Sequence, residues 1–469
     1  MAVVLIHGIG DQRPMATLRS FVEAVLEPNP LAPEQPLYWS KPDALSHTYE
    51  LRRYQARAGS KRPAIDFYEY YWAHRMEGSA VSHSLQWINN LLLRRPSAVP
   101  VRLRRLWWLS WLFALVVLTL IGCFWGWTPE GAVVVMLAML LATAKLVARL
   151  ALRDWIGDAA RYFDDRPRNV GVRESIRRGG VDLLKNLHEC REYGRIIVVG
   201  HSLGSAIAVD ILYHYWTSAR ETHASPDRPD QRMLFQFEKR LREPSSPSIA
   251  EVRQRQKALF KEIRGLGTEW RITDLVTLGS PLCHAPFLTG LSDEKFRHRL
   301  AQRELPTCPP VLDDKNLAYW TRYKTSDGKN RSIATLHHAA CFAVTRWSNL
   351  YFEHDGWFGG DPVGGPLQPL FGPGVDDCKV VTRHWKGRFN HLDYWRSDPR
   401  DDGSPAAPLT TLRRVLSLDE GFGPNPRNKE TATSATRQGR RAEPEGEAAP
   451  SPDDVCRPGV ASPQQASGE

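Results

Sequence analysis

Near the middle of the chain, an apolar strand, a serine between glycines and an apolar helix follow one another directly. Residues 195–200 (Arg-Ile-Ile-Val-Val-Gly) predict a buried strand, and residues 205–216 predict an apolar helix. The motif Gly200-His201-Ser202-Leu203-Gly204 joins the two. A turn this tight has no room for side chains at its two ends, and it presents the serine hydroxyl at the start of the helix. Such a junction predicts an α/β fold and makes Ser202 a candidate nucleophile.

Strand candidates alternate with helical segments over much of the remaining chain. The first, residues 2–6, is short, apolar and rich in β-branched side chains, and it enters a tight loop. No basic segment or cleavage site precedes it, which predicts a chain without an export signal. Further candidates lie at residues 65–72, 275–279, 347–352 and 379–382. This alternation predicts a mostly parallel sheet with helices on both faces.

Two of these strands end in motifs that resemble those of a known superfamily. The first strand reads Val4-Leu-Ile-His7-Gly8, and the strand before the serine reads Val198-Val-Gly-His-Ser-Leu-Gly204. The pair resembles the lipase and esterase side of the α/β-hydrolase superfamily. Residues 157–162 and 277–282 add a similarity to membrane-associated serine hydrolases of bacteria. The resemblance covers about residues 1–75 and 154–400, and it implies an α/β-hydrolase fold that cleaves carboxylic esters.

The same resemblance implies an oxyanion hole made by backbone amides. In acyl-transfer hydrolases a strand ending in His-Gly supplies one N–H group, and the residue after the nucleophile supplies the other. In this chain the donors would be the N–H groups of Ile9 and Leu203, with His7 and Gly8 shaping the first loop.

The triad order of the superfamily is serine, acid, histidine. His391, within the segment 389–395, follows the last strand candidate and is the expected base. The acid should follow strand 347–352, where both Asp355 and Asp361 qualify. Asp361 resembles the Asp-x-Val pattern at the acid position of many lipases and is favoured, and Asp355 stays the alternative.

A long apolar stretch interrupts the soluble character of the chain. Residues 106–127 form a run of 22 residues without a charge, which as a helix spans roughly 30 Å, one hydrocarbon core. A short turn at 128–131 leads to a second apolar stretch, residues 132–152. Trp residues gather at both ends of the first stretch, as in an aromatic belt. The sequence therefore predicts a transmembrane helical hairpin over residues 104–153, and a pair of buried core helices is the alternative.

Basic residues flank this predicted hairpin on both sides. Arginines precede it within 94–105 and follow it at Arg149 and Arg153, whereas the turn carries only Glu130. Positive flanks stay inside, so we expect a protein of the inner (cytoplasmic) membrane whose catalytic domain faces the cytoplasm. The net charge of +10 suits nucleic acid or an anionic membrane surface. Attraction of the arginine-rich flanks to anionic lipid explains it more simply, and we expect no nucleic-acid partner.

These features divide the chain into four parts. Residues 1–100 are expected to form the N-terminal part of the α/β domain, and residues 104–153 the hairpin. Residues 154–420 should complete the domain, with a charged insertion at about 218–268 that could be a lid. Residues 421–469 are rich in Pro, Gly, Ser, Glu and Arg and predict a disordered tail.

The resulting expectation is a membrane-anchored serine hydrolase that cleaves lipid or acyl-ester substrates through an acyl-enzyme. A catalytically silent scaffold or regulator of the same fold, and an acyltransferase, are the alternatives. The chain has no Walker A loop, no H-E-x-x-H motif and no dinucleotide fingerprint, so no cofactor and no metal are expected. Its seven cysteines form no Cys-x-x-Cys pair, which argues against a zinc ribbon. The oligomeric state stays open.

Overall fold

The computed structural model describes most of the chain, with gaps. It covers residues 1–9, 13–26, 35–46, 50–58, 62–76, 94–100, 162–222, 229–325, 327–354, 360–381, 390–396 and 407–419, together with Val101, Arg104, Trp107, Trp108, Trp111, Leu112 and Ala159. The alternative acid Asp355, the tail 421–469 and most of the predicted hairpin 104–153 lie outside the described residues.

Eight strands form one sheet in the order β10-β9-β6-β5-β1-β4-β3-β2, and β7 and β8 pair as a separate antiparallel hairpin. From β10 to β4 all neighbours run parallel, and β3 and β2 extend the sheet antiparallel. The strands are β1 (Ala2–Ile6), β2 (Trp39–Pro42), β3 (Arg52–Ala56), β4 (Ile65–Tyr70), β5 (Ile196–His201), β6 (Ile272–Leu278), β7 (Ala318–Lys324), β8 (Asn330–Leu336), β9 (Arg346–Phe352) and β10 (Val375–Val380). The predicted mostly parallel α/β sheet is confirmed.

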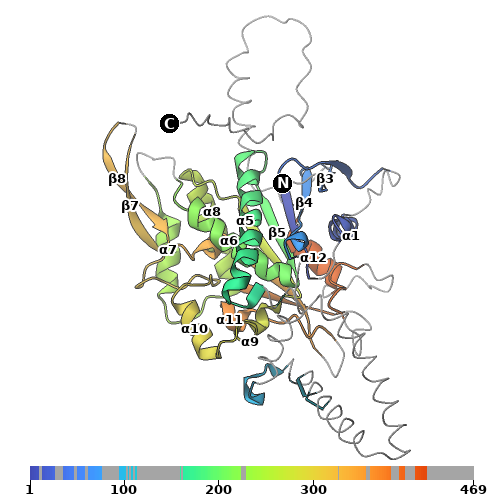
Figure 1. The fold of residues 1–469 in the computed structure, drawn as a ribbon. Helices are drawn as coiled ribbons and strands as arrows, with labels where there is room; N and C mark the ends of the chain where they lie inside the picture. The colour runs from blue at the N-terminus through green and yellow to red at the C-terminus, as the bar shows by residue number, and fades with distance from the viewer. Residues whose placement is uncertain are drawn as a thin grey trace, which may run out of the picture.

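Helices cover both faces of this sheet (Figure 1). The longer helices are α1 (Ala16–Val25), α5 (Pro167–Glu189), α6 (Leu203–Ala219), α7 (Arg232–Leu241), α8 (Ile249–Gly265), α10 (Asp293–Ala301) and α12 (Pro408–Leu416). Short turns of helix are η1 (Ala73–Met76), η2 (Pro96–Ala98), η3 (Pro281–His284), α9 (Ala285–Leu288), η4 (Cys341–Ala343) and α11 (Gln368–Phe371).

Alternate side chains of the central strands supply two separate cores. On β1, Val4 and Ile6 pack with α5, α6 and α8, whereas Val3 and Leu5 pack with α1 and α12. Figure 1 shows α5 and α6 on one side of the sheet and α1 and α12 on the other. Because successive side chains of a strand point to opposite faces, a strand buried on both faces is apolar throughout. This explains the continuous apolar runs at residues 2–6 and 196–199.

The strand order reverses beside β1. The chain runs from β1 toward β4 on one side, and it then crosses to β5, which lies on the other side of β1. In open parallel sheets, ligands bind outside the carboxyl ends of the strands at such a switch point. The loop His7-Gly8-Ile9 follows β1 and Ser202 follows β5, so both predicted motifs flank this point.

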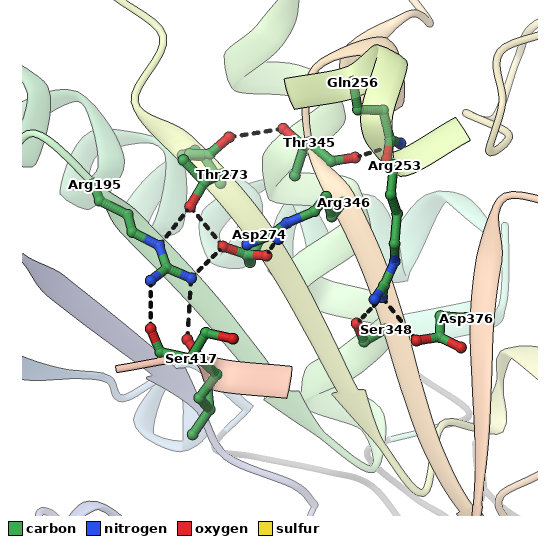
Figure 2. A network of polar contacts seen from close by, with 12 residues as sticks. Arg195, Arg253, Gln256, Thr273, Asp274, Thr345, Arg346, Ser348, Asp376 and Ser417 are labelled. Atoms are coloured by element: carbon green, nitrogen blue, oxygen red, sulfur yellow. Dashed lines mark hydrogen bonds and ion pairs between the residues drawn. The ribbon is translucent and has the colours of Figure 1, made fainter. Parts of the chain in front are cut away.

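A polar network closes the opposite, N-terminal ends of the strands (Figure 2). The Arg195 guanidinium donates to Asp274 at 2.8 Å and to the carbonyl oxygens of Leu416 and Ser417 at 3.0 and 2.7 Å. Arg346 donates to the other carboxylate oxygen of Asp274 at 2.7 Å. The last carbonyls of a helix have no partner within the helix. Arg195 therefore ties the end of α12 to β5 and β6.

The predicted insertion 218–268 contains α7 and α8. Phe237 and Leu259 from these helices are buried in the core, and Gln256 donates to the carbonyl oxygens of Phe342 and Thr345. Thr345 precedes β9, so α8 packs toward the N-terminal ends of the parallel strands. Ser202 lies at their C-terminal ends. The described part of this segment is thus built into the domain and lies away from the serine.

The structure differs from the sequence-based expectation at several elements. Strands β2, β3, β7 and β8 were not expected. His337 and His338 lie in an apolar run that would also suit a helix, but they follow the end of β8 in a turn, where the His337 N–H donates to the Leu317 carbonyl oxygen. The run from 333 to 344 is apolar because it is buried, and burial alone does not distinguish helix from strand.

Only part of the long apolar stretch is described. Within that part, as in the rest of the described chain, no helix is long and apolar enough to cross a membrane. Trp107 packs with Val99 and Phe287, whereas Trp108, Trp111 and Leu112 are 53%, 41% and 56% exposed. The remaining residues of the predicted hairpin 104–153 lie outside the described part of the chain.

Candidate active site

Ser202 lies at a strained turn between β5 and α6. Its backbone has φ 52° and ψ −128°, a conformation that L-residues rarely adopt. A Cβ atom at Gly200 would lie 2.5 Å from the Ser205 Cα, and one at Gly204 would overlap the carbonyl oxygens of Ile6 and His7. The two glycines of the motif are therefore required by the close approach of backbone. They allow α6 to begin directly against the end of β1.

Ser202, His391 and Asp361 form one chain of hydrogen bonds. The His391 Nε2 atom lies 2.9 Å from the Ser202 Oγ atom, and its Nδ1 atom lies 2.9 Å from the Asp361 Oδ2 atom. Because the carboxylate can only accept, Nδ1 carries the proton and Nε2 is free to accept from the serine hydroxyl. All three side chains are buried, with exposed fractions of 3%, 1% and 0%. The structure thus brings together the predicted nucleophile, base and acid.

Asp361 is held as a carboxylate by several donors. Its Oδ1 atom accepts from the Val363 N–H at 2.8 Å, and its Oδ2 atom accepts from His391 and, at 2.7 Å, from the Tyr394 hydroxyl. Burial disfavours the charged form, but the interactions with His391 and Tyr394 and the Gly364 N–H outweigh it and hold the pKa of Asp361 well below its usual range. Asp361 is therefore ionised and can stabilise the positive charge of the His391 ring when that ring takes up a proton.

His201, the residue before the serine, connects the base to the turn. Its Nε2 atom lies 3.0 Å from the carbonyl oxygen of His391, to which it donates. Burial lowers the pKa of His201 to about 3, so this ring is neutral. The Trp395 ring packs against it edge-on, with centroids 4.9 Å apart. His201 therefore fixes the backbone of the base against the turn that carries the nucleophile.

The loop after β1 lies directly beside the nucleophile. A Cβ atom at Gly8 would be 3.0 Å from the Ser202 Cβ atom, so this position suits glycine. The His7 Nε2 atom accepts from the Trp72 N–H at 3.2 Å, which leaves Nδ1–H to donate to the Gly8 carbonyl oxygen at 2.8 Å. Burial lowers the pKa of His7 to about 4, so the ring stays neutral.

The hydrogen bond from His7 to the Gly8 carbonyl oxygen orients the Ile9 N–H group, which was expected to bind an oxyanion. The peptide between Gly8 and Ile9 is planar and trans, so its C=O and N–H point in opposite directions. By holding the Gly8 carbonyl, His7 fixes the direction of the Ile9 N–H. Leu203 is the first residue of α6, a position whose N–H has no acceptor within the helix. Both amides were predicted from the sequence, whereas the orienting contact of His7 was not.

A cavity of about 250 Å³ lies along α6 on the side that faces α5. Ala206, Val209 and Asp210 line it from α6, and Leu282 and Ala285 line it from the segment after β6. Ala206 is four residues beyond Ser202, about 6 Å along the helix axis. Its lining combines apolar side chains with charged ones, the latter being Asp165, Asp210, Arg173, Arg177 and Arg299.

Among the described residues, no group of three or more His, Cys, Asp and Glu side chains is arranged to hold a metal ion. Asp355, the alternative acid, lies outside the described residues. Comparisons with protein-family models, with curated proteins and with solved structures found no match to this chain.

Proposed function

We propose that this protein is a serine hydrolase with an α/β-hydrolase fold, which cleaves carboxylic esters through an acyl-enzyme. One observation carries the proposal. The strained Ser202 at the end of β5 is linked through His391 to a buried, ionised Asp361, with every hydrogen bond at 2.9 Å. A strained backbone and a buried carboxylate both cost free energy. Such costly features are typical of catalytic sites, where they hold a nucleophile, a base and an acid in place.

The geometry supports a two-step reaction. The Ser202 oxygen attacks the ester carbonyl carbon while its proton moves to His391 Nε2, and Asp361 stabilises the resulting imidazolium. The oxygen that becomes negative accepts from the N–H groups of Ile9 and Leu203. His391 then gives the proton to the leaving alkoxide, and an acyl-serine remains. Water, activated by His391, releases the acid and restores Ser202.

The substrate class is an ester with an apolar acyl group. Ala206, one helical turn from the nucleophile, lines the cavity along α6, and Leu282 and Ala285 add apolar surface beside the charged side chains of its lining. Exposed Trp108, Trp111 and Leu112 lead into the uncharged sequence 113–127, which supports a membrane anchor that would bring the site to lipid or acyl-ester substrates. A series of p-nitrophenyl esters of rising chain length tests this preference, which should favour chains longer than acetyl.

The decisive test uses a fluorophosphonate probe on the full-length chain. The wild type should be labelled and should hydrolyse esters, whereas Ser202→Ala should lose both and keep its fold, because it removes a single oxygen. Ser348→Ala is the matched control, since Ser348 is also buried but lies within β9 beside Arg253 and takes no part in the hydrogen bonds of His391 and Asp361.

The outcomes separate the alternatives. Labelling that is unchanged in Ser202→Ala would exclude the serine-hydrolase mechanism. A wild type that is neither labelled nor active would favour the silent scaffold or regulator. Labelling with transfer of the acyl group to an added alcohol, in preference to water, would indicate an acyltransferase, because both reactions share the nucleophile and the oxyanion donors.

A further inference from the structure

We propose that Tyr394 is a positioning residue that holds Asp361 and limits how strongly His391 retains a proton. The inference rests on the proposed function, because it concerns the same three residues. It adds a fourth side chain, and it makes a measurable property of the base, the pH at which His391 loses its proton, depend on a hydroxyl bonded to Asp361.

The Tyr394 hydroxyl shares one oxygen of the acid with the base. It donates to Asp361 Oδ2 at 2.7 Å, the same atom that lies 2.9 Å from His391 Nδ1. It also accepts from the Phe352 N–H at 3.3 Å, at the end of β9. Its ring is fully buried and packs against the Phe352 ring, with centroids 5.0 Å apart. The hydroxyl is therefore fixed between the sheet and the carboxylate.

A short turn brings the base and this hydroxyl to the same oxygen. The Asp393 N–H donates to the Asn390 carbonyl oxygen at 3.0 Å, and the Asn390 side chain donates to the Asp393 carboxylate at 3.1 Å. The Asn390 N–H donates to the Gly360 carbonyl oxygen at 2.9 Å, which joins the turn to the loop of the acid. The spacing His391-x-x-Tyr394 thus places both side chains on Asp361.

Gly279 packs closely against this contact. A Cβ atom at Gly279 would lie 2.7 Å from the Tyr394 ring, 2.9 Å from Asp361 Oδ2 and 3.1 Å from the His391 ring. Gly279 also has φ 57°, where glycine is favoured. The segment after β6 therefore packs directly over the three side chains and holds them together.

The expected effect has a definite sign. A carboxylate that accepts from two donors on one oxygen spreads its charge and attracts an imidazolium less than a carboxylate with one donor. Burial and the charge of Asp361 raise the pKa of Tyr394 well above its usual value, so this hydroxyl stays a donor throughout the working range. Removing it should strengthen the bond from His391 to Asp361, and His391 should keep its proton to higher pH.

Few other titratable groups face His391 from the described elements. His201, at the end of β5, is neutral because burial lowers its pKa to about 3. Cys283, from η3, donates to the Val363 carbonyl oxygen at 3.4 Å. Asp393, on the same turn, is held by Asn390 and pairs with Arg396 at 3.5 Å. The charged group in direct contact with His391 is the Asp361 carboxylate, and the Tyr394 hydroxyl binds the same carboxylate.

The chain offers a matched control at the other end of the sheet. The Tyr193 hydroxyl donates to Asp66 Oδ2 at 2.6 Å and is equally buried in the core. Asp66 pairs with Ala2 at the start of β1, and Ala2 is aligned with Ile196 at the start of β5. Tyr193→Phe therefore removes the same kind of bond, roughly 15 Å or more from Ser202 along the strands.

The test compares the full-length wild type, Tyr394→Phe and Tyr193→Phe. The first measurement is an NMR titration of the ¹⁵N-labelled His391 ring, and the second is the pH dependence of inactivation by a fluorophosphonate. In Tyr394→Phe both midpoints should move up by about half a unit to one unit. The rate at the plateau should fall on the order of tenfold, because the acid loses one of its fixed contacts. Tyr193→Phe should leave both midpoints unchanged.

A second variant covers the case in which Tyr394→Phe does not fold. Replacement of Tyr394 by 3-fluorotyrosine keeps the shape and the hydroxyl, and fluorine makes the hydroxyl a stronger donor. Both midpoints should then move down. A His391 titration that is unmoved by either change, or that moves equally in Tyr193→Phe, would overturn the assignment.

The two proposals fail in different ways. If the wild type is not labelled by the fluorophosphonate, the proposed function fails, but the NMR titration still decides whether Tyr394 acts on His391. If labelling depends on Ser202 and the titration does not respond to Tyr394, the function stands and the role of Tyr394 falls.

Discussion

Asp361 orients His391 because its carboxylate can only accept a hydrogen bond from the ring and cannot donate one. Its two oxygens receive donors from Val363, His391 and Tyr394, and the pair with His391 fixes the proton on Nδ1. An asparagine at this position would present an N–H group to the ring. His391 would then carry its proton on Nε2 and could not accept one from Ser202.

Asp361→Asn should therefore lower the rate of ester hydrolysis by about 10⁴-fold while the protein stays folded. The measurement is kcat/KM with a p-nitrophenyl ester, next to a thermal unfolding curve. Asp355→Asn is the companion variant, and it should cost little. The reverse result, a large loss for Asp355→Asn and a small one for Asp361→Asn, would move the acid to Asp355.

The sequence, through chain order, strand positions and the resemblance to α/β-hydrolases, restricts the candidate site to Ser202, His391 and either Asp361 or Asp355. It does not reveal their supports. The contact of Tyr394 with Asp361 depends on the turn 390–393, and that of His7 with Gly8 depends on the ring position set by Trp72. The spacing His391-x-x-Tyr394 was visible, but nothing in the sequence says that both side chains meet one oxygen.

At the scale of elements, the network in Figure 2 joins helix α12, which lies far along the chain, to the centre of the sheet. Asp274 is 3% exposed and bonds to both Arg195 and Arg346. Burial disfavours its charge, but the two guanidinium groups outweigh burial and lower the pKa of Asp274. Loss of this carboxylate would leave two arginines without their shared partner.

Asp274→Asn should lower the free energy of unfolding by about 3 kcal/mol at pH 7, measured by urea unfolding. Because the pKa of Asp274 is lower in the folded than in the unfolded protein, its carboxylate stabilises the fold at pH values above the unfolded-state pKa. This contribution is lost as the pH falls through the folded-state pKa. The difference between variant and wild type should therefore shrink below about pH 4. Asp376→Asn is the control, because its pair with Arg253 at 2.9 Å is more exposed, and it should cost about 1 kcal/mol or less. Equal losses for the two variants would contradict the argument.

The strands that could be predicted are those buried on both faces, because their apolar runs are continuous. The missed strands have mixed faces. β7 consists of exposed and half-buried residues only, and β2 contains Lys41 and Pro42 at the edge of the sheet. Edge and hairpin strands carry polar and charged side chains, so the apolar pattern that marks a central strand is absent from them.

At the scale of the whole molecule, the segment after β6 connects the candidate site to the apolar stretch. Gly279 packs against Asp361 and His391, and Phe287, eight residues later, packs with Val99 and Trp107. The Arg94 guanidinium lies 5.2 Å from the centre of the Phe287 ring. Trp107, at the start of the run 106–127, is thus joined through Phe287 to the segment that also packs over Asp361 and His391.

If residues 106–152 span the membrane, the full-length protein should stay in the membrane pellet after alkaline carbonate extraction. Deletion of residues 104–152 should release it, because the remaining described domain has its own two cores on either side of the sheet. Recovery of the full-length chain in the soluble fraction would instead support the buried helical pair.

Charge decides the orientation of such an anchor. Both flanks of the hairpin carry arginines, whereas the turn 128–131 carries a single glutamate. Moving the flanks outward would oppose the positive-inside bias and the membrane potential, which is worth about 2.3 kcal/mol per charge per 100 mV. The domain with Ser202 should therefore face the cytoplasm.

Reporter fusions test this orientation. A fluorescent protein fused after residue 420 should fluoresce and alkaline phosphatase at the same junction should be inactive, whereas phosphatase inserted at Pro129 should be active. The two insertion points serve as controls for each other, because only one of them can lie on the outer side when the hairpin crosses twice. Active phosphatase after residue 420 would place the domain outside. The arginine flanks would then have crossed the membrane against the positive-inside bias and the membrane potential.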